Sequence, residues 1–332
     1  MSELKQRITM KAIIKPTIFF LLIGYFVKYL WSSFDAIFLE LRETCIWLAL
    51  GVVFLGILYQ LVEGKMVQTT IQVTGKPFRT VDGMLASCYA AFYRVITFGA
   101  GTWLAEINFY HRQNLTISEG VGVAVFRFML FKTAACILAI FFLIAEWYLF
   151  PAKMIWLVII CIVINLLING IILLAALSMP LQILFVILCD HWIKKAKWRA
   201  KVDQVNLQIN ALRQMTHDLM HKKRLLFEMI LWGIVKALIW FIIPYMCLKA
   251  DHPDVNLFIS LALISFVTVI SGVIPTPGGV GSFEISYMIF FTPYVGKVDA
   301  ASSLLLYRFA TFILPFIIGG AYTFISRKNN KN

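Results

Sequence analysis

Residues 275–282 of this chain read Pro-Thr-Pro-Gly-Gly-Val-Gly-Ser, and apolar segments lie on both sides of them. Proline removes a backbone hydrogen-bond donor and glycine readily adopts positive φ, so this run ends one helix before another begins. Non-helical backbone at membrane depth survives only when it is buried in protein or lines a wet cavity. The stretch therefore predicts a broken helical hairpin over residues 256–296; the alternative is a tight turn outside the membrane between two ordinary helices.

The composition of the whole chain supports a membrane setting for this break. Of the 332 residues, 61% are hydrophobic and only 14% are charged, with a formal net charge of +13. A soluble domain carries about a quarter charged residues, so too few polar side chains are present to cover a water-exposed surface. A soluble enzyme is excluded, and a basic excess in so apolar a chain indicates the positive-inside rule and anionic lipid rather than nucleic acid.

Apolar runs of about 20 residues, the length that crosses a bilayer, recur along the chain. They predict about six full crossings, at residues 13–31, 45–62, 119–147, 154–178, 226–248 and 301–325. The segments 81–115 and 256–296 are semi-apolar, and the second is apolar over residues 256–274. Each must begin and end on the same face of the membrane, so each is a hairpin that is either re-entrant or fully spanning. The predicted fold is an all-α polytopic membrane protein with residues 1–332 in a single integral membrane domain.

The positions of the charges orient this fold. Residues 179–225 form the longest polar stretch and carry nine basic and three acidic residues, a net +6. The N-terminal tail and residues 327–331 are basic as well. By the positive-inside rule, both termini and this linker are predicted to lie in the cytosol of a bacterial cell, with the protein in its cytoplasmic membrane. Apolar residues among the charges of the linker predict an amphipathic helix at the cytosolic headgroups.

A second glycine break lies in the first hairpin, where residues 97–102 read Thr-Phe-Gly-Ala-Gly-Thr. Each break is followed by a glutamate and, in the next crossing helix, by an arginine. The two series are Gly101, Glu106 and Arg127, and Gly281, Glu284 and Arg308. Because the topology makes the two hairpins open from opposite sides, this pattern favours an inverted repeat with a site near the middle of the membrane.

The broken hairpins also predict what such a site binds. A helix that starts at a break presents unpaired N–H groups and a positive dipole end, which suits phosphate, and guanidinium groups grip phosphate bidentately. The glutamates would pair the arginines or take the amine of a headgroup. The predicted substrate-binding residues are Gly278, Gly279, Gly281, Glu284, Arg308, Gly99, Gly101, Glu106 and Arg127.

Other ionisable residues fall within the apolar segments: Arg94, Lys132, Lys236 and Glu228. Such groups form structural ion pairs, face the interior of a helix bundle, or extend to the interface from a helix end. Lys132 and Lys236 are expected to extend to the headgroups, because each lies near a predicted cytosolic end. Asn165 and Asn169 are expected to join neighbouring helices.

The sequence predicts no metal, cofactor or catalytic residue. His217 and His221 have the spacing of a zinc-binding helix, but Asp218 replaces the usual glutamate and basic residues surround the pair. A nucleotide-binding lysine loop is absent from the sequence. The six cysteines are scattered without a C-x-x-C pair, which is typical of free thiols.

The run Pro-x-Pro-Gly-Gly-x-Gly-x-x-Glu over residues 275–284 resembles a signature of the lysylphosphatidylglycerol synthase transmembrane region family. Leu306-Tyr307-Arg308 with Pro315 is similar to the Tyr-Arg…Pro helix that follows it. Residues 96–115, leading into 117–135, resemble the family's Thr-Pro-x-x-x-Gly-Gly segment, although here the proline is absent and one glycine is displaced. The family includes the multiple peptide resistance factor, whose membrane part flips aminoacylated phosphatidylglycerol to the outer leaflet.

The resemblance implies a lipid flippase that confers resistance to cationic peptides, with an anionic or aminoacylated phospholipid as its partner. The linker at 179–225 is too short for the family's cytosolic synthase domain, so a separate synthase or a homo-oligomer is the expected protein partner. Three alternatives stay open: phosphatidylglycerol lysyltransferase activity or a subunit of that enzyme, a carrier of polyprenyl-phosphate or glycolipid, and an accessory subunit that anchors a partner.

Overall fold

The computed structural model describes residues 44–177, 222–249, 252–274, 276 and 280–329, together with scattered positions before residue 44 and between 186 and 219. The predicted first crossing at 13–31, most of the linker at 179–225, His221 and both termini lie outside the described residues. Within the described part the chain is helical and contains no strands, which confirms the predicted all-α membrane fold.

Five helical segments of the described residues are long and apolar enough to cross a membrane, and they overlap the predicted crossings after the first. They are α3 (Ile46–Gln72), α6 (Ile117–Glu146) with its 3-10 extension η1 (Trp147–Leu149), α7 (Ala152–Leu177), α10 (Lys223–Lys249), and the segment of α13 (Lys297–Arg308), η3 (Phe309–Ile313) and α14 (Leu314–Asn329).

The remaining helices form the two predicted hairpins. The first consists of α4 (Thr80–Ile96) and α5 (Thr102–Arg112), and the second of α11 (Leu257–Val273) and α12 (Ser282–Val295). At 1.5 Å per residue, the 11 residues of α5 and the 14 of α12 extend about 16 and 21 Å, short of the roughly 30 Å hydrocarbon core. These lengths favour re-entrant hairpins over hairpins that cross the membrane fully.

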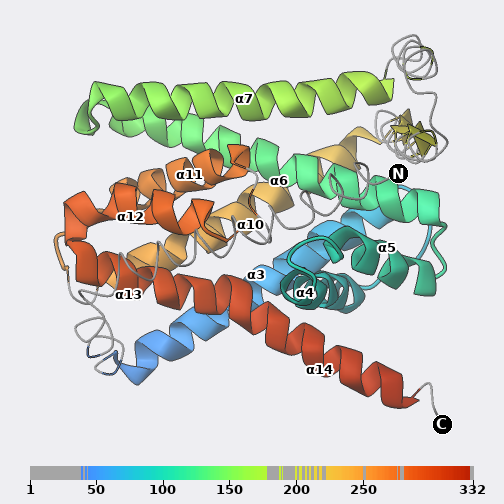
Figure 1. Ribbon diagram of the computed structural model, residues 1–332, viewed down its shortest axis with the longest axis horizontal. Coiled ribbons are helices and arrows are strands. Elements are labelled where there is room, and N and C mark those ends of the chain that lie inside the picture. The colour runs from blue at the N-terminus through green and yellow to red at the C-terminus, as the bar shows by residue number, and fades with distance from the viewer. Residues whose placement is uncertain are drawn as a thin grey trace, which may run out of the picture.

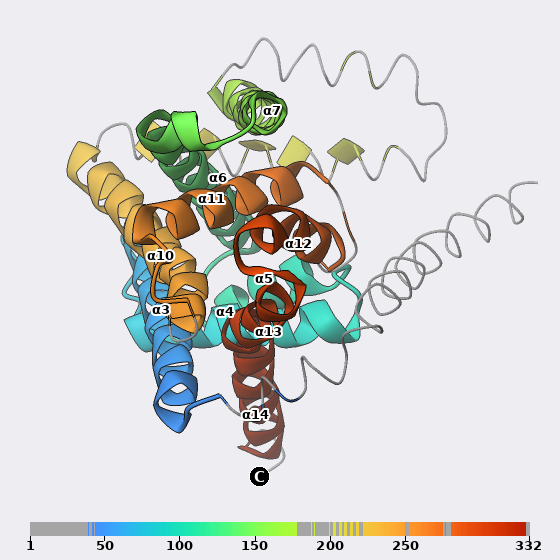
Figure 2. The ribbon, with the colours of Figure 1, turned by 90° about the vertical axis from the view of Figure 1, so that its left-hand side faces the viewer.

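The hairpins enter the helix bundle from opposite ends. In Figure 1, α4 and α5 lie toward the right, at the end where α3 finishes and α6 begins, whereas the turn from α12 to α13 lies at the far left. Figure 2, seen from that left end, places α11 and α12 beside α13, with α7 on the outer flank of α6. The arrangement has the opposed hairpins expected of an inverted repeat.

Helix α3 continues well past the end predicted for the second crossing. Residue 62 is the predicted end of that crossing, which leaves Glu63 outside it, yet the helix runs to Gln72 with Gln60 and Glu63 buried. The prediction was wrong because a carboxylate inside a membrane protein is tolerated when cations in the bundle interior pair with it.

Helix α4 lies against its neighbours at backbone distance. A Cβ atom on Gly83 would lie 2.5 Å from the carbonyl oxygen of Gly64 in α3, and one on Gly319 in α14 would lie 1.9 Å from the carbonyl oxygen of Cys88 in α4. Small residues at such crossings let membrane helices approach closely. The two contacts hold α4 between α3 and α14 and so fix the position of its last turns.

The last crossing is interrupted immediately after Arg308. Residues 309–313 form a π-helical turn before α14, and Pro315 follows it. Proline cannot donate the ordinary helical hydrogen bond, and π-turns occur often at functional sites. The turn places Thr311 and Pro315 on the wall of the same cavity as Arg308.

Candidate functional site

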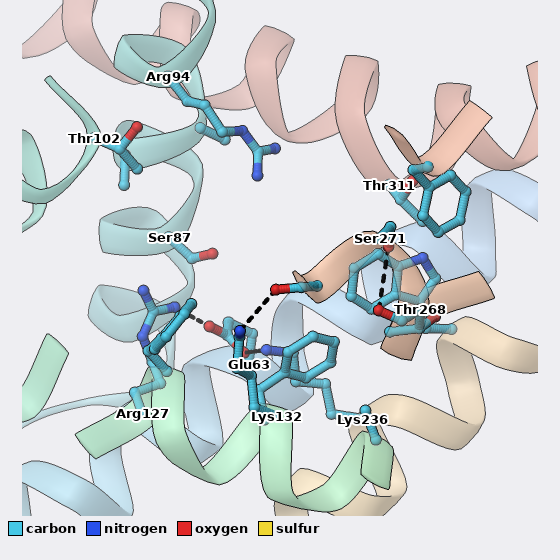
Figure 3. Close-up of a pocket in the computed structure, with 18 of the residues that line it drawn as sticks. Glu63, Ser87, Arg94, Thr102, Arg127, Lys132, Lys236, Thr268, Ser271 and Thr311 are labelled. Carbon is cyan, nitrogen blue, oxygen red and sulfur yellow. Dashed lines mark hydrogen bonds and ion pairs between the residues drawn. The ribbon is translucent and has the colours of Figure 1, made fainter. Parts of the chain in front are cut away.

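A cavity of about 470 Å³ lies between the two hairpins and the crossing helices around them. The first hairpin contributes Arg94, Thr102 and Glu106 to its wall, and the second contributes Gly272, Thr276 and Ser282. Figure 3 shows charged side chains from α3, α4, α6 and α10 directed toward this space. The cavity brings together residues that are more than 200 positions apart in the chain.

One side of the cavity is an ion-pair network centred on Arg127 of α6. Its Nη2 atom lies 2.7 Å from Oε2 of Glu106 in α5, and its Nη1 atom is hydrogen-bonded to Oε1 of Glu63 in α3. Tyr110 donates a hydrogen bond of 2.7 Å to the other oxygen of Glu106. Both glutamates are about 2% exposed, so this guanidinium is ion-paired with two carboxylates that have no access to bulk water.

Lys236 completes this network from α10. It is 5% exposed, its ammonium is ion-paired with Glu63, and the same ammonium lies 4.3 Å from the centre of the Phe131 ring. The prediction that Lys236 extends to the headgroups is wrong, because a buried carboxylate and an aromatic face satisfy its charge inside the bundle.

The second hairpin has a simpler ion pair. Nη2 of Arg308 lies 2.6 Å from Oε1 of Glu284, and the other oxygen of Glu284 accepts the backbone N–H of Gly281 at 2.6 Å. The guanidinium carbon of Arg308 also lies 4.4 Å from the centre of the Phe283 ring. Glu284 therefore caps α12 and orients Arg308, so of the two roles expected for it the structure shows the counter-ion.

Stacked aromatic rings connect the two ion-paired groups. Phe283 stacks on Tyr307 with centroids 5.1 Å apart, Tyr307 on Trp240 at 6.0 Å, and Trp240 on Phe131 at 5.1 Å. The stack begins beneath Arg308 and ends beneath Lys236. Rings from α12, α13, α10 and α6 thus make a rigid wall that sets the spacing of the two cations.

Lys132 lies on the cavity wall and binds only neutral acceptors. Its ammonium donates to Oδ1 of Asn165 at 3.1 Å and to the carbonyl oxygen of Gly272, near the end of α11, at 2.9 Å. It was expected to extend to the headgroups; instead it joins α6 to the second hairpin. Asn165 in turn donates to the carbonyl of Val269, so the expectation that it joins neighbouring helices is confirmed.

Arg94, near the end of α4, is a further cation on the cavity wall. Among the described residues its guanidinium has no carboxylate partner, and its buried Nε has no hydrogen-bond acceptor. The contact that the structure does show is with an aromatic face: the guanidinium carbon lies 4.8 Å from the centre of the Phe312 ring. Figure 3 shows the side chain extending from α4 into the cavity. The side chain is half-buried, and a guanidinium that is partly withdrawn from water without a counter-ion among the described residues points to an anionic ligand.

The glycines of the two breaks do not form the anion site expected of them. The N–H of Gly99 is bonded to the carbonyl of Arg94, that of Gly101 to Oγ1 of Thr97, and that of Gly281 to Glu284. None of these three glycines lies on the cavity wall. The expectation is wrong for them because the chain satisfies its own donors at each turn; Gly278 and Gly279 lie outside the described residues.

Of the predicted substrate-binding residues, Glu106, Arg127 and Arg308 line the cavity, and Glu284 lies behind it as the partner of Arg308. Sequence reasoning missed Glu63 as a site residue and left Arg94 unassigned. A signal for Glu63 existed, because Gln60, Glu63 and Gly64 share one face of a helix at spacings of three and four residues. The feature that marks Arg94, the absence of a counter-ion among the described residues, can be seen only in the tertiary structure.

The rim of the cavity is apolar. Trp103, Phe128 and Ile274 belong to its lining, and all three are among the large hydrophobic residues exposed on the protein surface. Trp103 and Phe128 meet edge to face with centroids 6.1 Å apart. In a membrane such side chains face hydrocarbon, so the charged interior opens beside the lipid tails.

The family model for the lysylphosphatidylglycerol synthase transmembrane region matches residues 12–319, nearly the whole chain. The chain belongs to this family. No curated protein sequence matches it. Membership in this family and the apolar helices identify a multi-pass membrane protein with a role related to lysylphosphatidylglycerol. The resemblance drawn from residues 275–284 is confirmed.

Proposed function

We propose that this member of the lysylphosphatidylglycerol synthase transmembrane-region family is a flippase that translocates a phosphatidylglycerol-type phospholipid between the two leaflets. The observation that carries the proposal is the cavity between two opposed hairpins, with Arg94 in its wall and no counter-ion for Arg94 among the described residues. Phosphatidylglycerol offers one phosphate for that guanidinium and glycerol hydroxyls for the polar side chains Thr102, Thr276 and Ser282.

The geometry favours translocation over binding at one face. Each hairpin stops inside the bundle, so a headgroup in the cavity is separated from either face by one hairpin only. The apolar rim at Trp103, Phe128 and Ile274 lets acyl chains stay in hydrocarbon while the headgroup lies among charges. Small movements of the hairpins would then open the cavity to one leaflet at a time.

The proposal places the protein in the cytoplasmic membrane of a bacterium with both termini in the cytosol. The basic sequence of residues 179–225 supports this orientation, because α7 ends and α10 begins at the end of the bundle where α3 finishes. The first hairpin would then open from the cytosol and the second from outside. A separate synthase, or a second copy of the chain, is the proposed protein partner.

The direct test is scrambling of fluorescent phosphatidylglycerol in proteoliposomes, measured as the fraction of label that dithionite bleaches from outside. The wild-type protein should expose inner-leaflet label that protein-free vesicles protect. Arg94→Gln should reduce the initial rate at least about tenfold, because it removes a charge-assisted contact to phosphate, and Arg308→Ala should reduce it as well, because it removes a cation from the cavity wall.

The matched control is Arg79→Gln, since Arg79 lies outside the cavity and pairs with Asp82 at 2.9 Å. It should scramble lipid at the wild-type rate. Protected label in wild-type vesicles that contain folded protein would contradict the proposal. Transfer of lysine from charged tRNA to phosphatidylglycerol by the purified chain would instead establish the lysyltransferase, and label exchange restricted to polyprenyl-phosphate would establish the carrier.

A further inference from the structure

The charges around the cavity do not balance. Its described lining includes the cations Arg94, Arg127, Lys132, Lys236 and Arg308 and the carboxylates Glu63 and Glu106, and Glu284 adds one negative charge as the partner of Arg308. Five cations and three carboxylates leave a net charge of +2. Positions 275 and 277–279, which fall outside the described residues, are proline and glycine and carry no charge.

Each carboxylate at the cavity is already neutralised by the protein. Glu63 pairs with Arg127 and Lys236, Glu106 with Arg127, and Glu284 with Arg308. Tyr110 and the backbone N–H of Gly281 bind the remaining oxygens of Glu106 and Glu284. An amine that entered this cavity would meet no carboxylate that lacks a cation among the described residues.

The uncompensated groups are all donors. Arg94 and Lys132 have no carboxylate partner in the part of the chain that the structure describes. Three lining residues each have a buried N–H without an acceptor there: Nε of Arg94, Nε of Arg127 and Nε1 of Trp240. Buried donors are normally paired, so this set calls for an acceptor that carries negative charge.

We infer that the cavity selects a lipid headgroup of net negative charge and disfavours a headgroup that bears lysine. Arg94 is the principal ligand of the phosphate, and Lys132 is the second cation without a carboxylate partner among the described residues. This inference rests on the proposed function and names its substrate class. Phosphatidylglycerol has a charge of about −1 at neutral pH, whereas its lysyl ester carries two amines and reaches about +1. A headgroup of net positive charge is disfavoured in a site of charge +2, because each carboxylate among the described residues of the site is already paired with a cation.

A lipid rather than a soluble phosphate ester is the source of this anion. The rim residues Trp103, Phe128 and Ile274 are exposed and apolar, so the approach to the cavity runs through hydrocarbon. A soluble phosphate would have to give up its hydration to pass them, whereas a lipid headgroup is carried there by its own acyl chains.

Binding in nanodiscs of phosphatidylcholine tests the inference separately from transport. Dihexanoyl phosphatidylglycerol, its lysyl ester and soluble glycerol 3-phosphate are titrated by calorimetry. Phosphatidylglycerol should bind at least about tenfold more tightly than the lysyl ester and than glycerol 3-phosphate. Equal or tighter binding of the lysyl ester overturns the charge selection, and equal binding of glycerol 3-phosphate overturns the lipid source.

Variants locate the selectivity. Arg94→Gln and Lys132→Gln should each weaken phosphatidylglycerol binding, Arg94→Gln by about tenfold or more, whereas Arg94→Lys should retain most of it. Arg94→Glu should narrow or reverse the preference over the lysyl ester. Arg79→Gln, outside the cavity, should bind as the wild type does. Unchanged affinity and preference in all folded Arg94 variants would overturn the role of Arg94.

The two proposals can fail independently. Selective binding of phosphatidylglycerol with no scrambling would refute the flippase and leave the charge selection standing. Scrambling of both lipids with a preference for the lysyl ester would support the flippase and overturn the charge selection.

Discussion

In both hairpins a side chain accepts the backbone N–H of a glycine at the break, but the two hairpins use different acceptors. In the first, between α4 and α5, the hydroxyl of Thr97 accepts the N–H of Gly101 at 2.7 Å. In the second, between α11 and α12, the carboxylate of Glu284 accepts the N–H of Gly281 and also binds Arg308. The first hairpin therefore has a neutral side chain as the acceptor at its break, and the second has a charged one.

The hairpins also differ in what they present to the cavity. Helix α4 carries Arg94, whereas α11 has no ionisable residue and contributes small polar groups such as Thr268 and Ser271. The arginine that follows the first break pairs with two carboxylates, and the one that follows the second pairs with Glu284. The two hairpins are similar in backbone architecture, and they differ in the charge that each presents to the cavity.

The largest expected effect comes from removing Arg127. Arg127→Ala leaves Glu106 without its cation and Glu63 with Lys236 alone, so the free energy of unfolding should fall by about 3–5 kcal/mol. Arg308→Ala should cost less, about 1–3 kcal/mol, because Glu284 keeps the N–H of Gly281. Equilibrium unfolding in mixed micelles measures both. If both variants lost the same free energy of unfolding, the ion pairs of the two hairpins would contribute equally to stability, against this prediction.

The next effect tests how each hairpin is held. A methyl group on Gly83 would lie 2.5 Å from a backbone oxygen, so Gly83→Ala should lower the free energy of unfolding by about 1–3 kcal/mol. A methyl group on Gly272 would meet the side chain of Asn165 at 3.3 Å and the ammonium of Lys132 at 3.9 Å, so Gly272→Ala should cost under about 1 kcal/mol. Gly170→Ala in α7 meets nothing within 4 Å and is the neutral control. A reversed order of Gly83 and Gly272 would contradict the close packing of α4.

The third prediction compares the breaks directly. Gly281 has φ +101°, which an L-residue adopts with strain, so Gly281→Ala should destabilise the protein by about 1–2 kcal/mol. Gly101 has φ −94°, which any L-residue adopts, and a Cβ there meets the side chain of Thr97 at 2.9 Å rather than backbone, so Gly101→Ala should cost less. Thermal unfolding followed by fluorescence-detected gel filtration ranks the stability of the two variants. Equal losses of stability would contradict the prediction that only the turn at Gly281 requires a glycine conformation.

The smallest expected effect on stability belongs to Arg94. Because its guanidinium has no counter-ion among the described residues, Arg94→Gln should leave the free energy of unfolding within about 0.5 kcal/mol or raise it, while scrambling falls about tenfold. Equilibrium unfolding in mixed micelles measures the free energy of unfolding, and the dithionite assay measures the scrambling rate. A marked loss of stability in Arg94→Gln would mean that the residue serves the fold rather than a ligand.

Much of the fold could be predicted because hydropathy and backbone chemistry are local properties. The crossings at 119–147 and 154–178 emerge within a few residues, since a run of about 20 apolar residues has one stable arrangement in lipid. The breaks at Gly99 and at Gly281 follow from glycine and proline alone. The end of α3 was missed because Glu63 looks like a linker residue until its partners on α6 and α10 are known.

The candidate site could be predicted only in part. Glu106, Arg127 and Arg308 were found because they follow the breaks at regular spacings. The glycine N–H groups were misassigned because a sequence does not show that Thr97 and Glu284 already accept them. Lys236 was misplaced because its distance from a helix end says nothing about a buried carboxylate on another helix.

The sequence by itself determined that this protein is a polytopic helical membrane protein of one family, with two broken hairpins that enter from opposite sides. Those properties depend on apolar length, on glycine and proline, and on the sign of the charges in the linkers, all of which are read along the chain. Only the tertiary structure decided which charges cancel. Ion pairing depends on distances of a few ångströms between helices far apart in sequence, and those distances leave Arg94 and Lys132 without carboxylate partners in the described part of the chain.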